Sequence, residues 1–463
     1  MLFNSFHYAV FFPTVVVLYY CCPQARRWAL LLVASCYFYL AYIPLYLPIL
    51  FGLIAMDYIG ALWIESAPAH KRRFYFVAGM AANLVYLGFF KYSNLLSMLL
   101  SGVVHPHQGP PPPLGLTFHT FQSMAYLIEV YCGRFKAERH FGYCATYVLF
   151  FPQLVAGPIE RPQQLLPQLR ETHSFQYDRT VTGLRLILLG LFKKVVLADN
   201  LGTYVDAVYA KPQSYLGPDL TLAALCFTLQ VYFDFAGYID IARGSSRVLG
   251  IELAESFKFP YFAKSIPEFW RRWNITLSAW FRDYVYVPLT YRRQATPMRH
   301  VGAVFVVFVL SGLWHGARWT FLIYGLLHGA YIAGSFLWRS ITSRFPFQQF
   351  KMWDWLQVAG TFALCNFAFV FVRANTVEDA WYIVRHLSVG WRAPLSPGVP
   401  RGFNIYLALT VAMVALEGLG AGTRPKLRFE EWPKPLRWSC YYLALFMIAA
   451  YGRYALAFFY EQF

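Results

Sequence analysis

Charged residues are scarce in this sequence, and no long polar segment interrupts it. Asp, Glu, Lys and Arg make up only 14% of the 463 residues, whereas about 25% is usual in a soluble domain. Apolar stretches recur from Tyr8 to Phe459. A chain of this composition is not built to face water on all sides, which argues against a string of soluble domains. We expect a single membrane-embedded domain over residues 1–463.

Several motifs that carry familiar chemistry are missing. The sequence has no Walker P-loop, no dinucleotide-binding GxGxxG, no GxSxG elbow and no HExxH, so ATP hydrolysis, hydride transfer and zinc proteolysis lack support. The eight cysteines form no CxxC pair, and we interpret most of them as small buried hydrophobic residues. We expect no metal site and no permanently bound cofactor. There is also no internal repeat, which counts against an inverted-repeat transporter.

Positive charge is in excess, with a formal net charge of +17. In a soluble protein this would suggest nucleic acid as a partner. Here the basic residues lie mostly in short loops between apolar stretches, where they favour the cytoplasmic side and contact anionic lipid headgroups. Arg26, Arg27 and residues 71–73 follow the first and third stretches, which predicts cytoplasmic first and third loops. We therefore expect membrane lipid, and no nucleic acid, as a partner.

Hydrophobic residues amount to 58% of the chain and recur in stretches of helical length. A bilayer core needs about 20 apolar residues per helix. The candidate spans are 7–22, 28–43, 45–64, 74–100, 115–132, 141–157, 181–198, 219–240, 300–314, 318–338, 354–373, 403–420 and 438–459. Some are short or broken, so the sequence predicts an all-α, polytopic protein with roughly eleven transmembrane helices plus re-entrant pieces. The first stretch has no basic n-region or cleavage site, and we expect a spanning helix there.

Two stretches carry too much proline to be plain lipid-facing helices. Residues 105–113 contain four consecutive prolines, which favour an extended polyproline loop. Residues 151–162 interrupt an apolar run with prolines and polar side chains. Irregular backbone survives at membrane depth only where protein or a watery cavity surrounds it. We therefore predict that 151–162 is buried among helices or lines a cavity.

Polar groups at helical spacing mark the segment 269–286. Asn274, Ser278 and Phe281 would share one face of a helix, and Arg282 belongs to a set of arginines that also fits an amphipathic helix on the cytoplasmic surface. A helix with a functional polar face and an amphipathic helix on the membrane surface are both compatible with this segment. A buried amide needs partners, and the apolar residues around Asn274 favour its burial.

A second polar group, His315, ends an apolar stretch and is followed by Gly316. Ionisable groups inside a membrane are costly and are candidates for function by default. A histidine satisfied by a backbone carbonyl is the competing interpretation, and from the residues alone both stay open. Trp314 and His328 are candidate substrate-binding residues together with Ser278 and Arg282, although His328 also fits a local supporting role.

Two carboxylates and an arginine lie in the apolar segment 230–244. Asp240 and Arg243, at i and i+3, can pair on a helix. Asp234 and Asp240 are six residues apart and point to different sides, so a paired-carboxylate hydrolase fits less well than a structural polar network. We predict that Asp234 finds donors on neighbouring helices.

These stretches, in this order, resemble the membrane-bound O-acyltransferase (MBOAT) family, in the branch of bacterial alginate O-acetyltransferase and the teichoic acid D-alanyl transfer protein. The resemblance rests on 113–122, 150–159, 234–238, 269–273, 281–284, 312–316 and 371–374, together with the aromatic C-terminal region. The family's catalytic histidine falls on His315. The position before Ile-Thr-Leu-Ser, which is usually histidine in this branch and asparagine in others, is Asn274.

The resemblance implies a ring of helices around a central funnel, with His315 at its narrowest point and within reach of Asn274. It implies a cytoplasmic acyl thioester donor, acetyl-CoA or an acyl carrier protein, and an extracytoplasmic hydroxyl acceptor on a polysaccharide. His315 would act as the base, and Asn274 would donate to the carbonyl oxygen. An extracytoplasmic acyltransferase or esterase-like partner protein is implied as well.

The sequence thus predicts a multi-pass enzyme of the bacterial inner membrane that O-acylates an envelope polymer or exopolysaccharide, with acetyl as the acyl group. One alternative is D-alanyl transfer from a carrier protein. An alternative of another class is a transporter or flippase without covalent chemistry.

Overall fold

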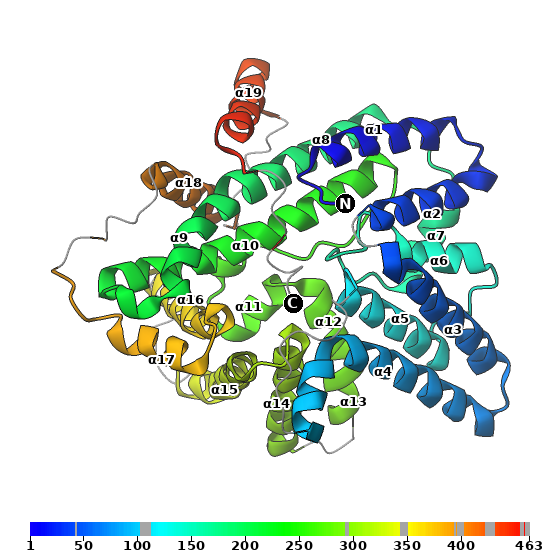
Figure 1. Ribbon diagram of the computed structural model, residues 1–463, viewed down its shortest axis with the longest axis horizontal. Helices are drawn as coiled ribbons and strands as arrows, with labels where there is room; N and C mark the ends of the chain where they lie inside the picture. The colour runs from blue at the N-terminus through cyan, green and yellow to red at the C-terminus, as the bar shows by residue number, and fades with distance from the viewer. Residues whose placement is uncertain are drawn as a thin grey trace. The chain divides into compact units, whose positions relative to one another are not determined.

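Helices are the only regular secondary structure among the described residues (Figure 1). The computed structural model describes residues 1–41, 44–101, 113–291, 296–342, 351–392, 395, 402–421, 431–453 and 458. The all-α prediction is confirmed over these ranges. All but the last residue of the proline-rich stretch 105–113 falls outside them. The chain divides into two compact units, which are taken one at a time below.

The first unit comprises Met1–Leu188 and Tyr238–Glu255 among the described residues. Its helices are α1 (Phe6–Cys21), α2 (Gln24–Leu40), α3 (Leu47–Ser66), α4 (Ala69–Ser101), α5 (Leu116–Tyr131), α6 (Phe141–Leu149), α7 (Pro162–Arg170), most of α8 (Tyr177–Leu191) and the end of α10 (Gly217–Val248). Within it, α3 packs against α4, α5 and α6, and α2 packs against α6.

The second unit comprises Leu189–Gly237 and Ser256–Phe459. It holds a π-helical segment (Phe192–Ala198), α9 (Asp199–Ala210), the first part of α10, α11 (Ile266–Arg272), α12 (Ile275–Phe281), a second π-helical segment (Arg282–Tyr286), α13 (Val287–Thr290), α14 (Pro297–His315), α15 (Trp319–Thr342), α16 (Lys351–Arg373), α17 (Val377–His386), α18 (Phe403–Ala421) and α19 (Lys434–Tyr451). Here α15 packs against α14, α11 and α16.

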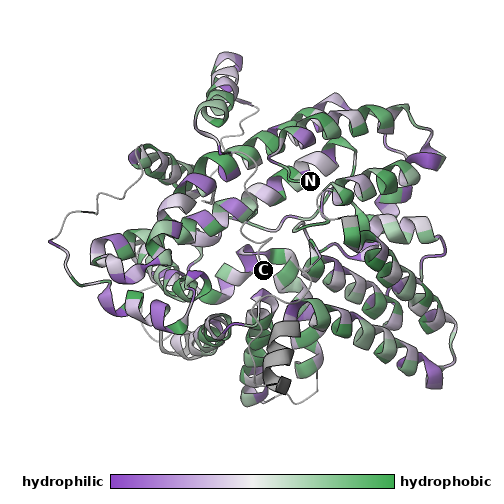
Figure 2. Ribbon diagram, in the orientation of Figure 1, coloured by the Kyte–Doolittle hydropathy of each residue, from purple (hydrophilic) through white to green (hydrophobic). Residues whose placement is uncertain are grey.

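Helices occur at all of the predicted spans, and several are suited to a bilayer. Five of the described helical stretches are long and apolar enough to cross one: Leu47–Ser66, Ala69–Tyr92, Gly217–Val248, Pro297–His315 and Met352–Arg373. Figure 2 shows hydrophobic residues running along the helices, with hydrophilic ones gathered at many helix ends. Many large apolar side chains, Phe6 and Leu419 among them, are exposed on the protein surface, as lipid-facing residues are.

Two predicted helices differ from the observed ones. The expected span 141–157 ends as a helix at Leu149, because Pro152 disfavours helical backbone at the residue before it. The expected continuous helix over 269–286 is broken after Arg272 and restarts at Ile275. Asn274 therefore lies outside the helix that carries Ser278 and Phe281.

The prediction that 151–162 is enclosed by protein is confirmed by the irregular, buried course of Phe151–Glu160. Its polar groups find partners inside the first unit: the Gln153 amide donates to the Tyr147 carbonyl oxygen at 2.7 Å, and the Tyr147 hydroxyl donates to the Glu160 carbonyl oxygen at 2.7 Å. Bonds of this kind replace the helical ones that the prolines remove.

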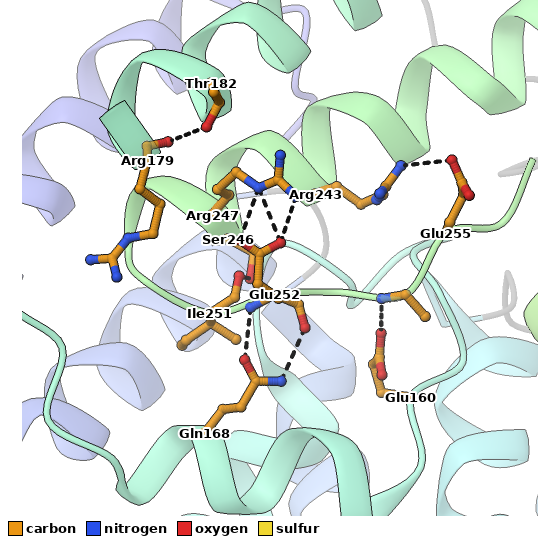
Figure 3. Close-up of polar contacts among 11 residues, drawn as sticks. Glu160, Gln168, Arg179, Thr182, Arg243, Ser246, Arg247, Ile251, Glu252 and Glu255 are labelled. Carbon is orange, nitrogen blue, oxygen red and sulfur yellow. Dashed lines mark hydrogen bonds and ion pairs between the residues drawn. The ribbon is translucent and has the colours of Figure 1, made fainter. Parts of the chain in front are cut away.

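Side chains hold the extended segment that follows α10 (Figure 3). Gln168 accepts from the Glu252 amide at 2.8 Å and donates to the Glu252 carbonyl oxygen at 3.0 Å. The Glu160 carboxylate accepts from the Ala254 amide at 2.6 Å. Side chains of α7 and of the segment before it thus satisfy backbone groups of this extended segment. In a β-sheet, a neighbouring strand would do so.

Candidate active site

His315 is the last residue of α14, in the second unit. Helix α14 begins at the Thr296 cap, whose side chain accepts from the Arg299 amide, and it packs closely on α15. A Cβ atom added at Gly312 would overlap the carbonyl oxygen of Phe321. Only glycine permits this approach, which seats the end of α14 against the start of α15.

Aromatic rings surround the His315 side chain, which is 5% exposed. Trp314 lies with its ring centroid 4.8 Å from the imidazole, Tyr324 at 5.6 Å and Phe321 at 5.8 Å. The predicted burial of a histidine at the end of this helix is confirmed. An imidazole that acts as a base must be in its neutral form to accept a proton.

Asn274 lies at the break between α11 and α12, with left-handed backbone at φ 38°. Backbone bonds from an extended segment hold the break on both sides: Lys258 N donates to Arg272 O at 2.9 Å, and Ile275 N donates to Ser256 O at 2.8 Å. Asparagine is among the few residues besides glycine that tolerate this conformation. The side chain is 3% exposed, which confirms its predicted burial.

A chain of aromatic contacts links the two segments. Tyr324 stacks on Phe369 of α16 with centroids 6.0 Å apart, and Phe369 lies 5.4 Å from Trp273, the neighbour of Asn274. All three rings are at most 2% exposed. Packed rings thus run without a break from the His315 imidazole to the neighbour of Asn274 within this unit.

His328 lies inside the second unit, on α15. It is fully buried and its Nδ1 accepts from the Trp270 indole N–H at 3.2 Å. The ring also lies 4.8 Å from that of Tyr324, which in turn contacts His315. The bond to Trp270 reaches from α15 to α11, and both the predicted supporting role of His328 and its proposed substrate contact stay predictions.

The other candidate residues lie at different depths. Trp314 is 4% exposed. Ser278 is half-buried and its hydroxyl donates to the Trp273 carbonyl oxygen at 3.1 Å. Arg282 is 64% exposed and pairs with Asp283 at 2.7 Å. This bond raises the pKa of the Arg282 guanidinium. The exposed side chain carries its charge at the protein surface.

The carboxylate predictions have separate outcomes. Asp234 accepts from the Lys194 ammonium group at 2.6 Å, which confirms that it finds a donor on a neighbouring element. In the first unit, Arg243 lies 3.8 Å from Glu255, and its pairing with Asp240 stays a prediction. Over the described parts of the chain, no group of three or more His, Cys, Asp and Glu could hold a metal ion.

Sequence reasoning missed the aromatic residues beside His315. Phe321, Tyr324 and His328 follow one another at intervals of three and four residues, which places them on one face of α15. That spacing was visible in the sequence. Phe369 and Trp273 could not be assigned in this way, because only tertiary packing brings them together.

Comparison with known proteins gives one consistent family. The model of the membrane-bound O-acyltransferase family matches residues 138–377, a range that contains every candidate site residue. The peptidoglycan O-acetyltransferase of Helicobacter pylori is 34% identical over 385 residues, covering 77% of this chain and 72% of that protein. A probable alginate O-acetylase of Pseudomonas putida is 35% identical, covering 80% and 76%. The teichoic acid D-alanyltransferase of Bacillus subtilis is 29% identical, covering 51% and 64%.

Proposed function

Since this chain belongs to the membrane-bound O-acyltransferase family and is a membrane O-acyltransferase, we propose that it transfers acetyl groups to hydroxyls of a cell-envelope or secreted polysaccharide. Two relatives that it resembles over more than three quarters of its length are named for O-acetyl transfer, one for peptidoglycan and one for alginate. Their names speak against the alternative of a transporter without covalent chemistry.

His315 is the proposed general base. Its imidazole takes the proton of the acceptor hydroxyl as that oxygen attacks the carbonyl carbon of the acyl thioester. The new C–O bond forms, the C–S bond breaks, and the proton passes to the departing thiolate, so the step needs no further reactant. Asn274 is the proposed donor to the carbonyl oxygen as negative charge develops on it. Trp314, Ser278 and His328 would contact the substrates, and Arg282 would attract an anionic donor at the surface.

The wider setting is part of the same proposal. The donor is a cytoplasmic thioester, acetyl-CoA or an acyl carrier protein, and the acceptor lies on the opposite side of a bacterial inner membrane. The proposed architecture has roughly eleven spans in a single domain around a funnel whose narrowest point holds His315 near Asn274. The acyl group could also pass to an extracytoplasmic acyltransferase or esterase-like partner.

The observation that carries the proposal is the burial of His315 and Asn274 at two helix ends joined by packed aromatic rings. The test supplies membranes containing the protein with radiolabelled acetyl-CoA and either alginate or peptidoglycan fragments. Label transfer that disappears in His315→Ala supports the proposal. Transfer that survives in His315→Ala contradicts it.

D-alanyl transfer is the second candidate, favoured by the similarity to the Bacillus subtilis enzyme. That similarity covers about half of this chain at lower identity, which is why we place it second. Supplying D-alanyl carrier protein in place of acetyl-CoA in the same assay separates the two donors.

A further inference from the structure

A buried polar cluster in the first unit takes no part in the proposed chemistry. Asp57 on α3, Asn83 on α4 and Ser123 on α5 are each at most 2% exposed. The Asn83 amide donates to Asp57 Oδ1 at 2.7 Å, and Ser123 faces the same carboxyl group. Three helices of an apolar bundle thus bring polar groups to one point.

Three oxygen atoms of this cluster lack a hydrogen-bond partner among the described residues: Asp57 Oδ2, Asn83 Oδ1 and Ser123 Oγ. Buried polar atoms are nearly always partnered, and each exception calls for an explanation. Here three such atoms belong to one small group of side chains. Their common feature is that all three can offer lone pairs to a positive charge.

Charge balance gives a second argument. Within the described chain, Asp57 forms no ion pair with a lysine or arginine. Cys144 on α6 is a titratable neighbour of Asp57, and His119 lies one turn before Ser123 on α5. An isolated buried carboxylate is prohibitively costly in an apolar interior. A water molecule would satisfy hydrogen bonds but leave this charge in place.

We propose that Asp57, Asn83 and Ser123 form an intramembrane site for one monovalent cation, either Na⁺ or a proton. A single positive charge neutralises the single carboxylate, whereas a divalent ion would leave a net charge buried. Carboxylate, amide and hydroxyl oxygens are the ligands that hard cations take. Occupancy of the site ties together α3, α4 and α5.

Thermal unfolding of the purified full-length protein in detergent tests the site. Bound Na⁺ stabilises the folded state by mass action, so Tm should rise by roughly 1–3 °C for each tenfold increase in NaCl above the dissociation constant, compared with choline chloride at equal ionic strength. If the occupant is a proton, Na⁺ has no specific effect. Tm then falls as pH rises, because Asp57 binds a proton in the folded state that it does not bind in the unfolded state. Raising the pH removes this proton and the stability that it contributes.

Asp57→Asn keeps the shape and removes the charge, so it should lose whichever dependence the wild type shows. Ser123→Ala keeps the charge and removes one ligand. It should need more NaCl for the same Tm in the Na⁺ case and keep the pH dependence in the proton case. An infrared band of a protonated carboxyl group, absent from Asp57→Asn, identifies the proton directly.

The proposal is overturned if the wild-type Tm responds to neither Na⁺ nor pH, or if Asp57→Asn responds as the wild type does. If Asp57→Asn does not fold, the Ser123→Ala titration decides the Na⁺ case. A carboxyl infrared band that shifts in Ser123→Ala, where the hydroxyl facing Asp57 is gone, then assigns the proton to Asp57, and the absence of both signals rejects the site.

Discussion

Lys194 and Asp234 form a buried ion pair in which the ammonium nitrogen lies 2.6 Å from Oδ1 of the carboxylate. Lys194 projects from a π-helical segment, where it also lies 2.8 Å from Asp199. Both side chains of the first pair are at most 3% exposed. Buried pairs of this kind become strongly unfavourable when one partner is removed, so we expect the pair to stabilise the fold without taking part in catalysis.

Asp234→Asn should lower folded yield and Tm while leaving the activity of the folded fraction within a few-fold of wild type. Asparagine still accepts from Lys194, but a neutral hydrogen bond replaces a charged one and Asp199 is left as the carboxylate beside Lys194, which corresponds to a loss of about 1–3 kcal/mol. Asp206→Asn is the matched control, because Asp206 pairs with Arg373 but is 65% exposed. A folded but inactive Asp234→Asn would show that the carboxylate belongs to the chemistry.

His315→Ala should have the reverse effect, with yield preserved and acyl transfer reduced about 10²–10⁴-fold, the usual contribution of a general base. The measurement is the transfer of labelled acetyl groups from acetyl-CoA to an added polysaccharide. His7→Ala, which changes an exposed histidine bonded to Tyr37, should behave as wild type. Retained transfer in His315→Ala would place the base elsewhere.

Asn274→Gly and Asn274→Ala should separate the conformational role of Asn274 from its chemical role. Both remove the amide donor and should reduce turnover about 10²–10³-fold. Only alanine should also destabilise the protein, by about 1 kcal/mol, because its Cβ atom disfavours φ 38°. Paired measurements of Tm and turnover check this. An active Asn274→Gly would rule out the amide as the oxyanion donor.

His328→Ala should destabilise the protein by roughly 2–5 kcal/mol, since it leaves a cavity among packed rings and an unpaired Trp270 indole N–H. His328→Gln retains an acceptor and should recover part of that loss. Turnover per folded molecule should stay within about tenfold of wild type, well above that of His315→Ala. A folded His328→Gln with the activity of His315→Ala would give His328 a direct role.

Gly325→Ala should weaken the contact between α14 and α15. The added Cβ atom would overlap the Phe308 carbonyl oxygen, and such overpacking costs about 1–3 kcal/mol. Gly334→Ala, on the same helix with open space around it, should keep or slightly raise Tm, because alanine favours helical backbone. Equal Tm values for the two variants would mean that the helices do not need this close approach.

The helices could be predicted from the sequence because a helix that crosses a bilayer needs about 20 apolar residues, and stretches near this length recur along the chain. The motif around His315 likewise identified a buried histidine at a helix end. Two features depended on long-range contacts that no local pattern contains. The break at Asn274 is held by the backbone of Ser256 and Lys258, and the link from Tyr324 to Trp273 passes through Phe369 on a distant helix.

Local rules account for the remaining errors. Periodicity alone favoured one helix through 269–286, because both halves carry polar residues at helical spacing. The end of α6 at Leu149 could have been read from Pro152, but the apolar residues after it masked the signal. Lys194 pairs with Asp234 because tertiary packing brings them together. No local pattern in the sequence indicates which carboxylate pairs with which cation.

The left-handed backbone at Asn274 restricts which substitutions a diverging lineage can explore at that position. Glycine, asparagine, aspartate and histidine enter this conformation most readily, and of these only asparagine and histidine offer a neutral side-chain N–H. A lineage can therefore exchange one for the other without rebuilding the chain around it. Glutamine, lysine or arginine would bring a donor but also carry the conformational penalty of an ordinary side chain. The backbone conformation at this one position thus limits the residue types that can supply a neutral side-chain donor there.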